Sequence, residues 1–169
     1  MLTGTLPTER QAFAFDTAAI LHMVHGMNAS TFVARIITST LADIYGAITG
    51  AISALDGPLH GGANQDVMEM LLAIKTTGED PVDYVCQKMD QGERIPGFGS
   101  RAYAVKDPRG MILQHLLETV GAGNEDIEWS PYCTQIEQYM QEEKGLAANL
   151  DFYSAPLYNQ LSIPVDLYT

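Results

Sequence analysis

Basic residues are scarce in this sequence. It contains 9 Lys and Arg residues against 21 Asp and Glu residues, which gives a formal net charge of −12. A protein that binds nucleic-acid phosphates or an anionic membrane surface needs a basic face, so the imbalance argues against both partners. An acidic composition is found both in salt-adapted proteins and in proteins that are simply well solvated, and the composition alone does not distinguish these two cases. Because 46% of the 169 residues are apolar, the chain has enough material to bury a core.

Cysteine is also rare, and targeting signals are lacking. Cys86 and Cys133 stand alone, without the spacing of a zinc site or a disulfide framework, so we expect free thiols in a reducing, cytoplasmic setting. The N-terminus has neither the charged nor the apolar segment of a signal peptide. The longest weakly charged run, residues 36–55, carries Asp43 and five Ser or Thr residues, and we interpret it as a buried helix rather than a membrane span.

Helical patterns run through most of the chain and predict an all-α fold. Thr8 and Gln11 have the spacing of a capping box, which predicts a helix to about residue 25. Asn28 marks a second helix start. Further helices are expected over residues 64–75, from Pro81 onward, and over 108–120, 131–143 and 152–161, with short strands near 94–95 and 102–103.

The second helix has an unusual composition. Apolar residues recur every three or four positions from Ile37 to Leu55, and small residues fill most of the positions between them. Such a helix is either buried on all sides within its own chain or packed closely against a partner chain. A kink or break is expected at Gly46 or Gly50, because glycine costs about 1 kcal/mol in a helix interior.

Four of the nine basic residues gather in residues 94–109, where Asp107 is the single acid. These basic residues are Arg94, Arg101, Lys106 and Arg109. A basic cluster on a glycine-containing loop suits an anionic small molecule, since the guanidinium group matches carboxylate or phosphate geometry. The alternative is that these side chains pair with the surrounding acids.

Two further segments place an ionisable side chain at a helix start. His60 lies in a Gly- and Pro-rich turn before a helix, where the positive end of the helix dipole favours a neutral imidazole. A neutral imidazole can polarise a carbonyl, although a lone histidine is also common as a structural residue. Asp151 begins a helix among apolar and aromatic residues, where a carboxylate serves either as a base or as an N-cap. The residue pattern leaves these alternatives open.

These segments belong to four motifs that resemble the citrate synthase family when they are taken together in chain order. The motifs are His22 and His25 followed by Asn28-Ala29-Ser30-Thr31-Phe32; Gly57-Pro58-Leu59-His60-Gly61-Gly62-Ala63-Asn64; Gly97-Phe98-Gly99 followed by Arg101, Tyr103 and Asp107-Pro108-Arg109; and Asn149-Leu150-Asp151-Phe152-Tyr153-Ser154. The acidic composition and residues 142–169 are further similar to the haloarchaeal branch of that family.

The resemblance implies an acyltransferase of the tricarboxylic acid cycle, which joins acetyl-CoA to oxaloacetate and releases citrate and CoA. By motif, Asp151 would remove a proton from the acetyl methyl group, and His60 would stabilise the resulting enol by a hydrogen bond. His25 and Arg109 would bind oxaloacetate, and Arg101 would approach CoA. Acetyl-CoA is then a cosubstrate, and the resemblance implies neither a permanently bound cofactor nor a metal.

Ser100 departs from the family pattern, which has a histidine there that donates to the oxaloacetate carbonyl. Loss of such a donor lowers a rate by roughly 10²–10³-fold. The resemblance assigns residues 1–56 to large-domain helices of dimer-interface type, 57–155 to the small domain, and 156–169 to a truncated return to the large domain. It therefore implies a homodimer. The competing hypothesis is a non-catalytic, truncated module that binds carboxylate or CoA, or that only dimerises.

Overall fold

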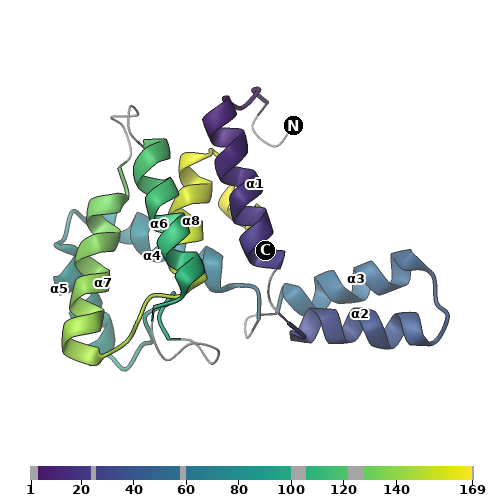
Figure 1. The fold of residues 1–169 in the computed structure, drawn as a ribbon. Helices are drawn as coiled ribbons and strands as arrows, with labels where there is room; N and C mark the ends of the chain where they lie inside the picture. Colours follow the sequence, from purple (N-terminus) through teal and green to yellow (C-terminus); the bar gives the residue numbers. More distant parts are fainter. Residues whose placement is uncertain (1–3, 24–25, 58–59, 100–105, 122–127, 169) are drawn as a thin grey trace.

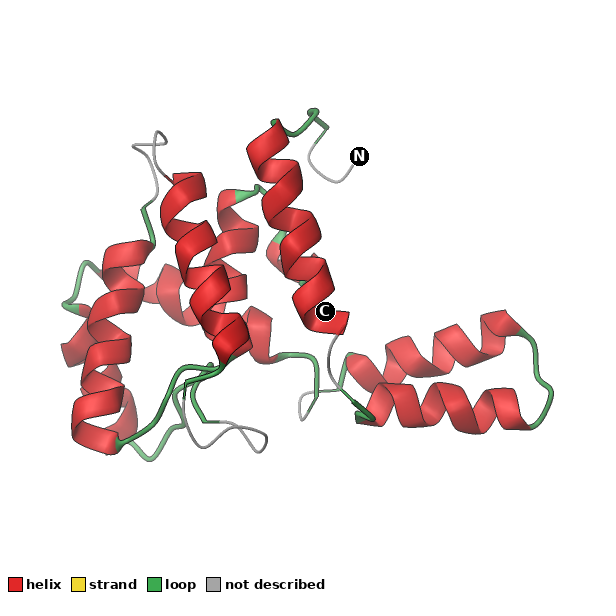
Figure 2. Cartoon of the chain, in the orientation of Figure 1, coloured by secondary structure: helices red, strands yellow, loops and turns green. Residues whose placement is uncertain are grey.

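The computed structural model of the chain describes residues 4–23, 26–57, 60–99, 106–121 and 128–168. These residues form eight α-helices and one short 3₁₀ helix, which confirms the all-α fold (Figures 1 and 2). The helices are α1 (Glu9–Met23), α2 (Ala29–Ser39), α3 (Ile44–Leu55), α4 (Ala63–Thr77), α5 (Pro81–Asp90), α6 (Pro108–Gly121), α7 (Ser130–Lys144), α8 (Leu150–Gln160) and η1 (Val165–Leu167).

No strand forms near residues 94–95, so that expectation is wrong, and residues 102–103 lie outside the described part of the chain. The β pairing among the described residues is a single bridge between Phe98 and Ala148. Within the described ranges, no helix is both long enough and apolar enough to cross a membrane.

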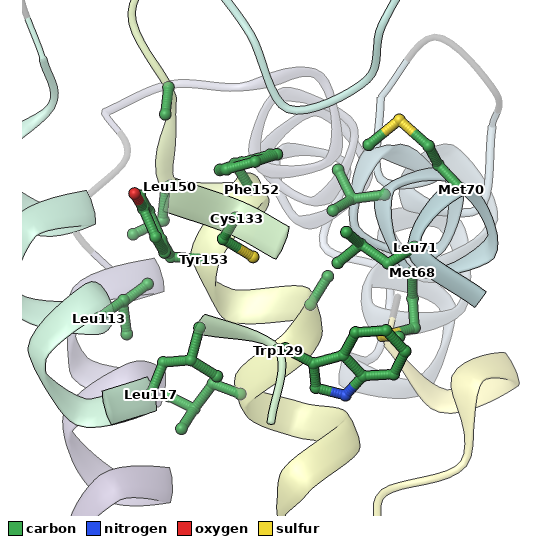
Figure 3. Close-up of a cluster of buried hydrophobic side chains, with 14 of the residues drawn as sticks. Met68, Met70, Leu71, Leu113, Leu117, Trp129, Cys133, Leu150, Phe152 and Tyr153 are labelled. Atoms are coloured by element: carbon green, nitrogen blue, oxygen red, sulfur yellow. The ribbon is translucent and has the colours of Figure 1, made fainter. Parts of the chain in front are cut away.

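Helix α8 is the centre of the core. It packs against α4 and α6, while α1 lies alongside α6 and α8 (Figure 1). Eight of its eleven residues are buried, so it is enclosed on almost every side. Figure 3 shows Phe152 and Tyr153 of α8 among Leu71 of α4, Leu117 of α6 and Trp129 at the start of α7. This enclosure packs the first turn of α8, which carries Asp151, against the hydrophobic core.

Helices α2 and α3 form an antiparallel hairpin that projects from this core (Figure 1). The chain reverses at Thr40–Asp43, where the Asp43 carboxylate caps α3 by accepting from the Gly46 N–H at 2.8 Å. The break predicted at Gly46 or Gly50 is therefore wrong, because both glycines lie inside α3. Gly50 instead allows close packing of the two helices, since a Cβ there would lie 2.4 Å from Cδ1 of Ile37.

The hairpin leaves large apolar side chains exposed. Of the two alternatives for residues 36–55, burial within their own chain is therefore wrong. The side chains more than 45% exposed are Phe32, Ile36, Leu41, Ile44, Tyr45, Ile48 and Ile52. Packing of the hairpin against a partner chain remains a prediction.

The two cysteines are both free thiols, as expected. Cys86 in α5 is half-buried, and Cys133 in α7 is buried completely. Burial raises the pKa of the Cys133 thiol above its ordinary value, which makes it a packing residue rather than a nucleophile.

Candidate active site

The turn that carries His60 connects α3 to α4. Its backbone is closed by two hydrogen bonds, from the His60 N–H to the Gly57 carbonyl at 2.9 Å and from the Gly61 N–H to the Leu55 carbonyl at 2.8 Å. The imidazole reaches across to the first turn of α2. There the backbone N–H of Ser30 donates to Nε2 of His60 at 3.2 Å, and the Ser30 hydroxyl lies 2.9 Å from the same atom.

This contact determines the tautomer of His60. The Ser30 N–H belongs to the first turn of α2, where backbone donors lack a partner within the helix. Because an N–H can only donate, Nε2 must present its lone pair, and the network assigns the ring proton to Nδ1. Sequence reasoning did not single out Ser30 as a partner of His60, although Ser30 lies in one of the four motifs.

Asp151 is the second residue of α8 and is half-buried. The side chain of Asn149 caps this helix, since its Oδ1 accepts from the N–H groups of Asp151 at 2.9 Å and Phe152 at 3.3 Å. Asp151 is therefore not the N-cap, and its carboxylate is not required for that role. Two turns further along α8, burial and the charge of Asp151 raise the pKa of Tyr158 to about 12.

Backbone contacts join the motifs that lie far apart in the sequence. The N–H of Asn149 donates to the Gly97 carbonyl at 2.9 Å, and its side-chain amide donates to the Gly99 carbonyl at 3.2 Å. Beneath these contacts, the buried hydroxyl of Ser154 donates to Oδ1 of the buried Asn64 at 2.6 Å. The last motif is thereby connected both to the glycine loop and to the helix that follows His60.

Arg109 is held by a buried carboxylate. Its Nε donates to Oδ1 of Asp107 at 3.0 Å and its Nη2 donates to Oδ2 at 2.7 Å, a bidentate pairing. Asp107 is 2% exposed. Nη1 also lies 3.4 Å from the Leu21 carbonyl, near the end of α1. Arg109 is thus fixed in orientation between α1 and the start of α6.

This pairing predicts a specific acid sensitivity. Burial raises the pKa of Asp107, but the hydrogen bonds and charge of Arg109 outweigh burial and hold that pKa below its usual value. The pair therefore stabilises the fold above pH ~4 and loses this contribution as the pH falls through the lowered pKa. We expect Asp107→Asn to lower the free energy of unfolding at pH 7 and to flatten its decline between about pH 5 and pH 2, measured by urea unfolding.

The matched control for that experiment is Asp66→Asn, which removes an exposed carboxylate from the first turn of α4. Its pH profile should follow the wild type. If the free energy of unfolding of Asp107→Asn declines with falling pH as steeply as that of the wild type, the assignment of this pKa shift to Arg109 is contradicted.

The basic cluster of residues 94–109 is partly paired with acids, as the alternative interpretation held. Lys106 contacts Glu137, and Arg109 contacts Asp107, whereas Arg94 is exposed. No three His, Cys, Asp or Glu side chains gather into a possible metal site in the part of the chain that the structure describes.

Three predicted site residues, His25, Ser100 and Arg101, lie outside the described residues. Their neighbour in the first motif, His22, lies in α1 with its Nδ1 2.8 Å from the Ala18 carbonyl. The structure therefore joins the segment of Asp151 to the helix that follows His60 and packs the helix of Arg109 against α8. The positions of the other three residues remain predictions.

Comparison with known proteins agrees with the motifs. The whole chain, residues 1–169, matches the family model described as citrate synthase, C-terminal domain. It is 51% identical over 169 residues to the citrate synthase of Haloferax volcanii, covering 100% of this chain and 45% of that protein. It is 44% identical over 170 residues to the citrate/2-methylcitrate synthase of Bacillus subtilis, covering 100% of this chain and again 45% of that protein.

A solved structure extends the similarity to the fold. Citrate synthase from Thermoplasma acidophilum, in a ternary complex with carboxymethyl coenzyme A and oxaloacetate, matches with a TM-score of 0.82 at 31% identity. The match covers 96% of this chain and 44% of that one. The chain thus spans about half the length of the relatives that it matches. Since the family model covers every residue, the chain belongs to the citrate synthase family.

Proposed function

We propose that this chain contributes to a citrate-synthase-type reaction, in which acetyl-CoA, oxaloacetate and water give citrate and CoA. The observation that carries the proposal is the hydrogen bond from the Ser30 N–H to Nε2 of His60. It leaves the Nδ1–H of a neutral imidazole as the donor for an oxygen that gains negative charge. The Thermoplasma acidophilum relative was solved with oxaloacetate and a coenzyme A derivative, which supports these substrate classes.

Asp151 is proposed as the base that removes a proton from the acetyl methyl group. As that C–H bond breaks, its electron pair forms the enol, and the thioester oxygen accepts a hydrogen bond from His60. The methyl carbon then forms a bond to the keto carbon of oxaloacetate, while the π pair of that C=O bond moves to the oxygen, which takes up a proton and becomes a hydroxyl. Water then cleaves the C–S bond of the thioester, which leaves a carboxylate and releases CoA as the thiol. A base of this kind contributes roughly 10²–10⁴-fold to a rate.

Arg109 is proposed to bind a carboxylate of oxaloacetate, together with His25. Asp107 holds the guanidinium in one orientation, which lowers the entropy lost when an anion binds. Arg101 is proposed to contact CoA, and Ser100 to replace the histidine that donates to the oxaloacetate carbonyl. A serine hydroxyl is shorter and carries no positive charge, so it polarises a carbonyl less.

The α2–α3 hairpin is proposed as the contact surface of a homodimer. Its exposed apolar residues include Tyr45 at 80% and Ile52 at 59%, more than isolated surface side chains would explain. On this proposal, residues 1–56 supply the interface, residues 57–155 form the small domain with its substrate-binding loops, and residues 156–169 begin the return to the large domain.

A second candidate is a non-catalytic module that binds a carboxylate or CoA, or that only dimerises. One observation favours it: residue 100 is a serine, where the family pattern implies a catalytic histidine. The two candidates predict different outcomes with acetyl-CoA and oxaloacetate, because the enzyme releases CoA and the non-catalytic module does not.

The deciding experiment follows free thiol release from acetyl-CoA in the presence of oxaloacetate, with propionyl-CoA tested in parallel because the Bacillus subtilis relative is named for 2-methylcitrate also. We expect slow release by the wild type and a rise of roughly 10²–10³-fold in Ser100→His, since that change restores a strong donor. Ser100→Ala is the matched control and should not gain activity. If neither the wild type nor Ser100→His releases thiol above background, the enzymatic proposal is contradicted and the non-catalytic module is supported.

A further inference from the structure

A polar cluster at the junction of α6, α7 and α8 has no part in the chemistry described above. Glu137 of α7 accepts hydrogen bonds from Lys106, with Nζ 2.7 Å from Oε1 and 2.8 Å from Oε2. The hydroxyl of Tyr153 in α8 donates to Oε2 of the same carboxylate. Lys106 also donates to the side chain of Gln114 in α6 at 2.8 Å, and its Nζ lies 5.2 Å from the centre of the Tyr153 ring.

The burial of this cluster makes its geometry restrictive. The side chain of Glu137 is 15% exposed and that of Lys106 is 29% exposed, so water competes weakly for either charge. Tyr153 is 1% exposed, and burial together with Glu137 raises the pKa of its hydroxyl above the ordinary range. The hydroxyl therefore remains a permanent donor, and one carboxylate connects a lysine and a tyrosine from different parts of the chain.

Each partner of Glu137 lies close along the chain to a proposed active-site residue. Lys106 directly precedes Asp107, the carboxylate that orients Arg109. Tyr153 lies two residues after Asp151, in the same first turn of α8. The cluster therefore spans the two backbone segments that carry the proposed carboxylate-binding group and the proposed base.

We propose that Glu137 is a positioning residue that fixes the segment of Arg109 relative to the first turn of α8 and thereby sets the separation of the oxaloacetate site from the base. The identity of the bound carboxylate rests on the proposed function. The positioning itself rests on the contacts of Glu137 with Lys106 and Tyr153, and it is testable without turnover.

The first test is hydrogen exchange of backbone amides, followed by mass spectrometry of peptides. In Glu137→Gln, we expect exchange to accelerate by roughly 10-fold or more in residues 106–112 and 149–155, because a bond to a charged group is lost. Exchange in α4 should not change. Unchanged exchange at residues 106–112, or an equal rise in α4, would overturn the proposal, since the second result indicates general destabilisation.

Four further variants separate positioning from charge and from folding. Glu143→Gln is the matched control, because it removes an exposed carboxylate from the last turn of the same helix. Lys106→Met should reproduce the acceleration at residues 106–112, and Lys106→Arg should retain protection by keeping the charge. If Glu137→Gln does not fold, Tyr153→Phe removes a single hydroxyl, and we expect it to accelerate exchange at residues 149–155; normal protection there would overturn the proposal.

The second test measures oxaloacetate binding by calorimetric titration, and KM where turnover is present. We expect Glu137→Gln to weaken oxaloacetate binding by about 10-fold while KM for acetyl-CoA stays near the wild-type value, and Glu143→Gln to change neither. Equal effects on both substrates would contradict positioning of Arg109. Failure of the wild type to bind oxaloacetate would contradict the proposed function, and the hydrogen-exchange result would still decide the role of Glu137.

Discussion

Replacement of Asp151 by asparagine is expected to lower the rate of thiol release from acetyl-CoA by about 10³-fold, within the usual range for loss of a general base. Asparagine has nearly the same shape as aspartate, but its amide is far too weak a base to remove the methyl proton. The helix should remain intact, because Asn149 supplies its cap and the backbone N–H of residue 151 keeps its acceptor. The measurement is a progress curve of thiol release at saturating oxaloacetate. It is made in the wild type or in the Ser100→His background, whichever is the more active.

Asp83→Asn is the matched control for this variant. Asp83 also lies in the first turn of a helix, α5, so both substitutions remove a carboxylate from a position favoured by the helix dipole. The two variants should therefore lose similar, small amounts of stability, while Asp83→Asn keeps full activity. Unimpaired release by Asp151→Asn, or an equal loss in Asp83→Asn, would show that Asp151 is not the base.

Gly97→Ala is expected to lower the free energy of unfolding by about 3–5 kcal/mol, a large share of the total stability of a small domain. Gly97 has φ +82°, a conformation that is strained for any residue with a Cβ. An added Cβ would lie 2.8 Å from Cβ of Phe152 and 2.9 Å from Cγ2 of Val67. Both atoms belong to fully buried side chains of the core, so they have little room to move.

Gly99→Ala separates the two causes of the expected loss of stability, which are backbone strain and overlap of the added Cβ with the core. Gly99 has φ +78°, but among the described residues other than its chain neighbours no atom lies within 4 Å of the position that its Cβ would take. It should therefore show the backbone cost alone, about 1–2 kcal/mol. Urea unfolding of both variants measures the difference. Equal losses would mean that the close approach of Gly97 to Phe152 contributes nothing to stability.

Much of the candidate site could be predicted from the sequence, because its residues lie in short contiguous motifs. A motif keeps the local turn and the reactive side chain together, as in the Gly- and Pro-rich turn of His60 and the capped helix of Asp151. The predicted role of Asp151 as a possible N-cap was wrong, since Asn149 offers its side-chain oxygen two residues earlier. Adjacent residues of similar capping preference cannot be ranked by preference alone.

The helix boundaries were predicted less well where packing decided them. The sequence between Asn28 and Leu55 favours one long helix with a weak point at a glycine. The structure reverses instead at Thr40–Asp43, where Leu41 adopts φ +62° and Asp43 caps the returning helix. The reversal allows Gly50 to approach Ile37 closely, a contact between residues thirteen positions apart that no local propensity encodes.

By itself, the sequence determined the all-α class and the family, and it pointed to His60, Asp151 and Arg109 as the proposed site residues, since each of these depends on local pattern and motif. Only the tertiary structure decided the tautomer of His60, which depends on a backbone N–H thirty residues away in α2. It likewise decided that Glu137, unremarkable in the sequence, joins Lys106 to Tyr153. A hydrogen bond requires two groups within about 3 Å, and only folding brings such distant groups together.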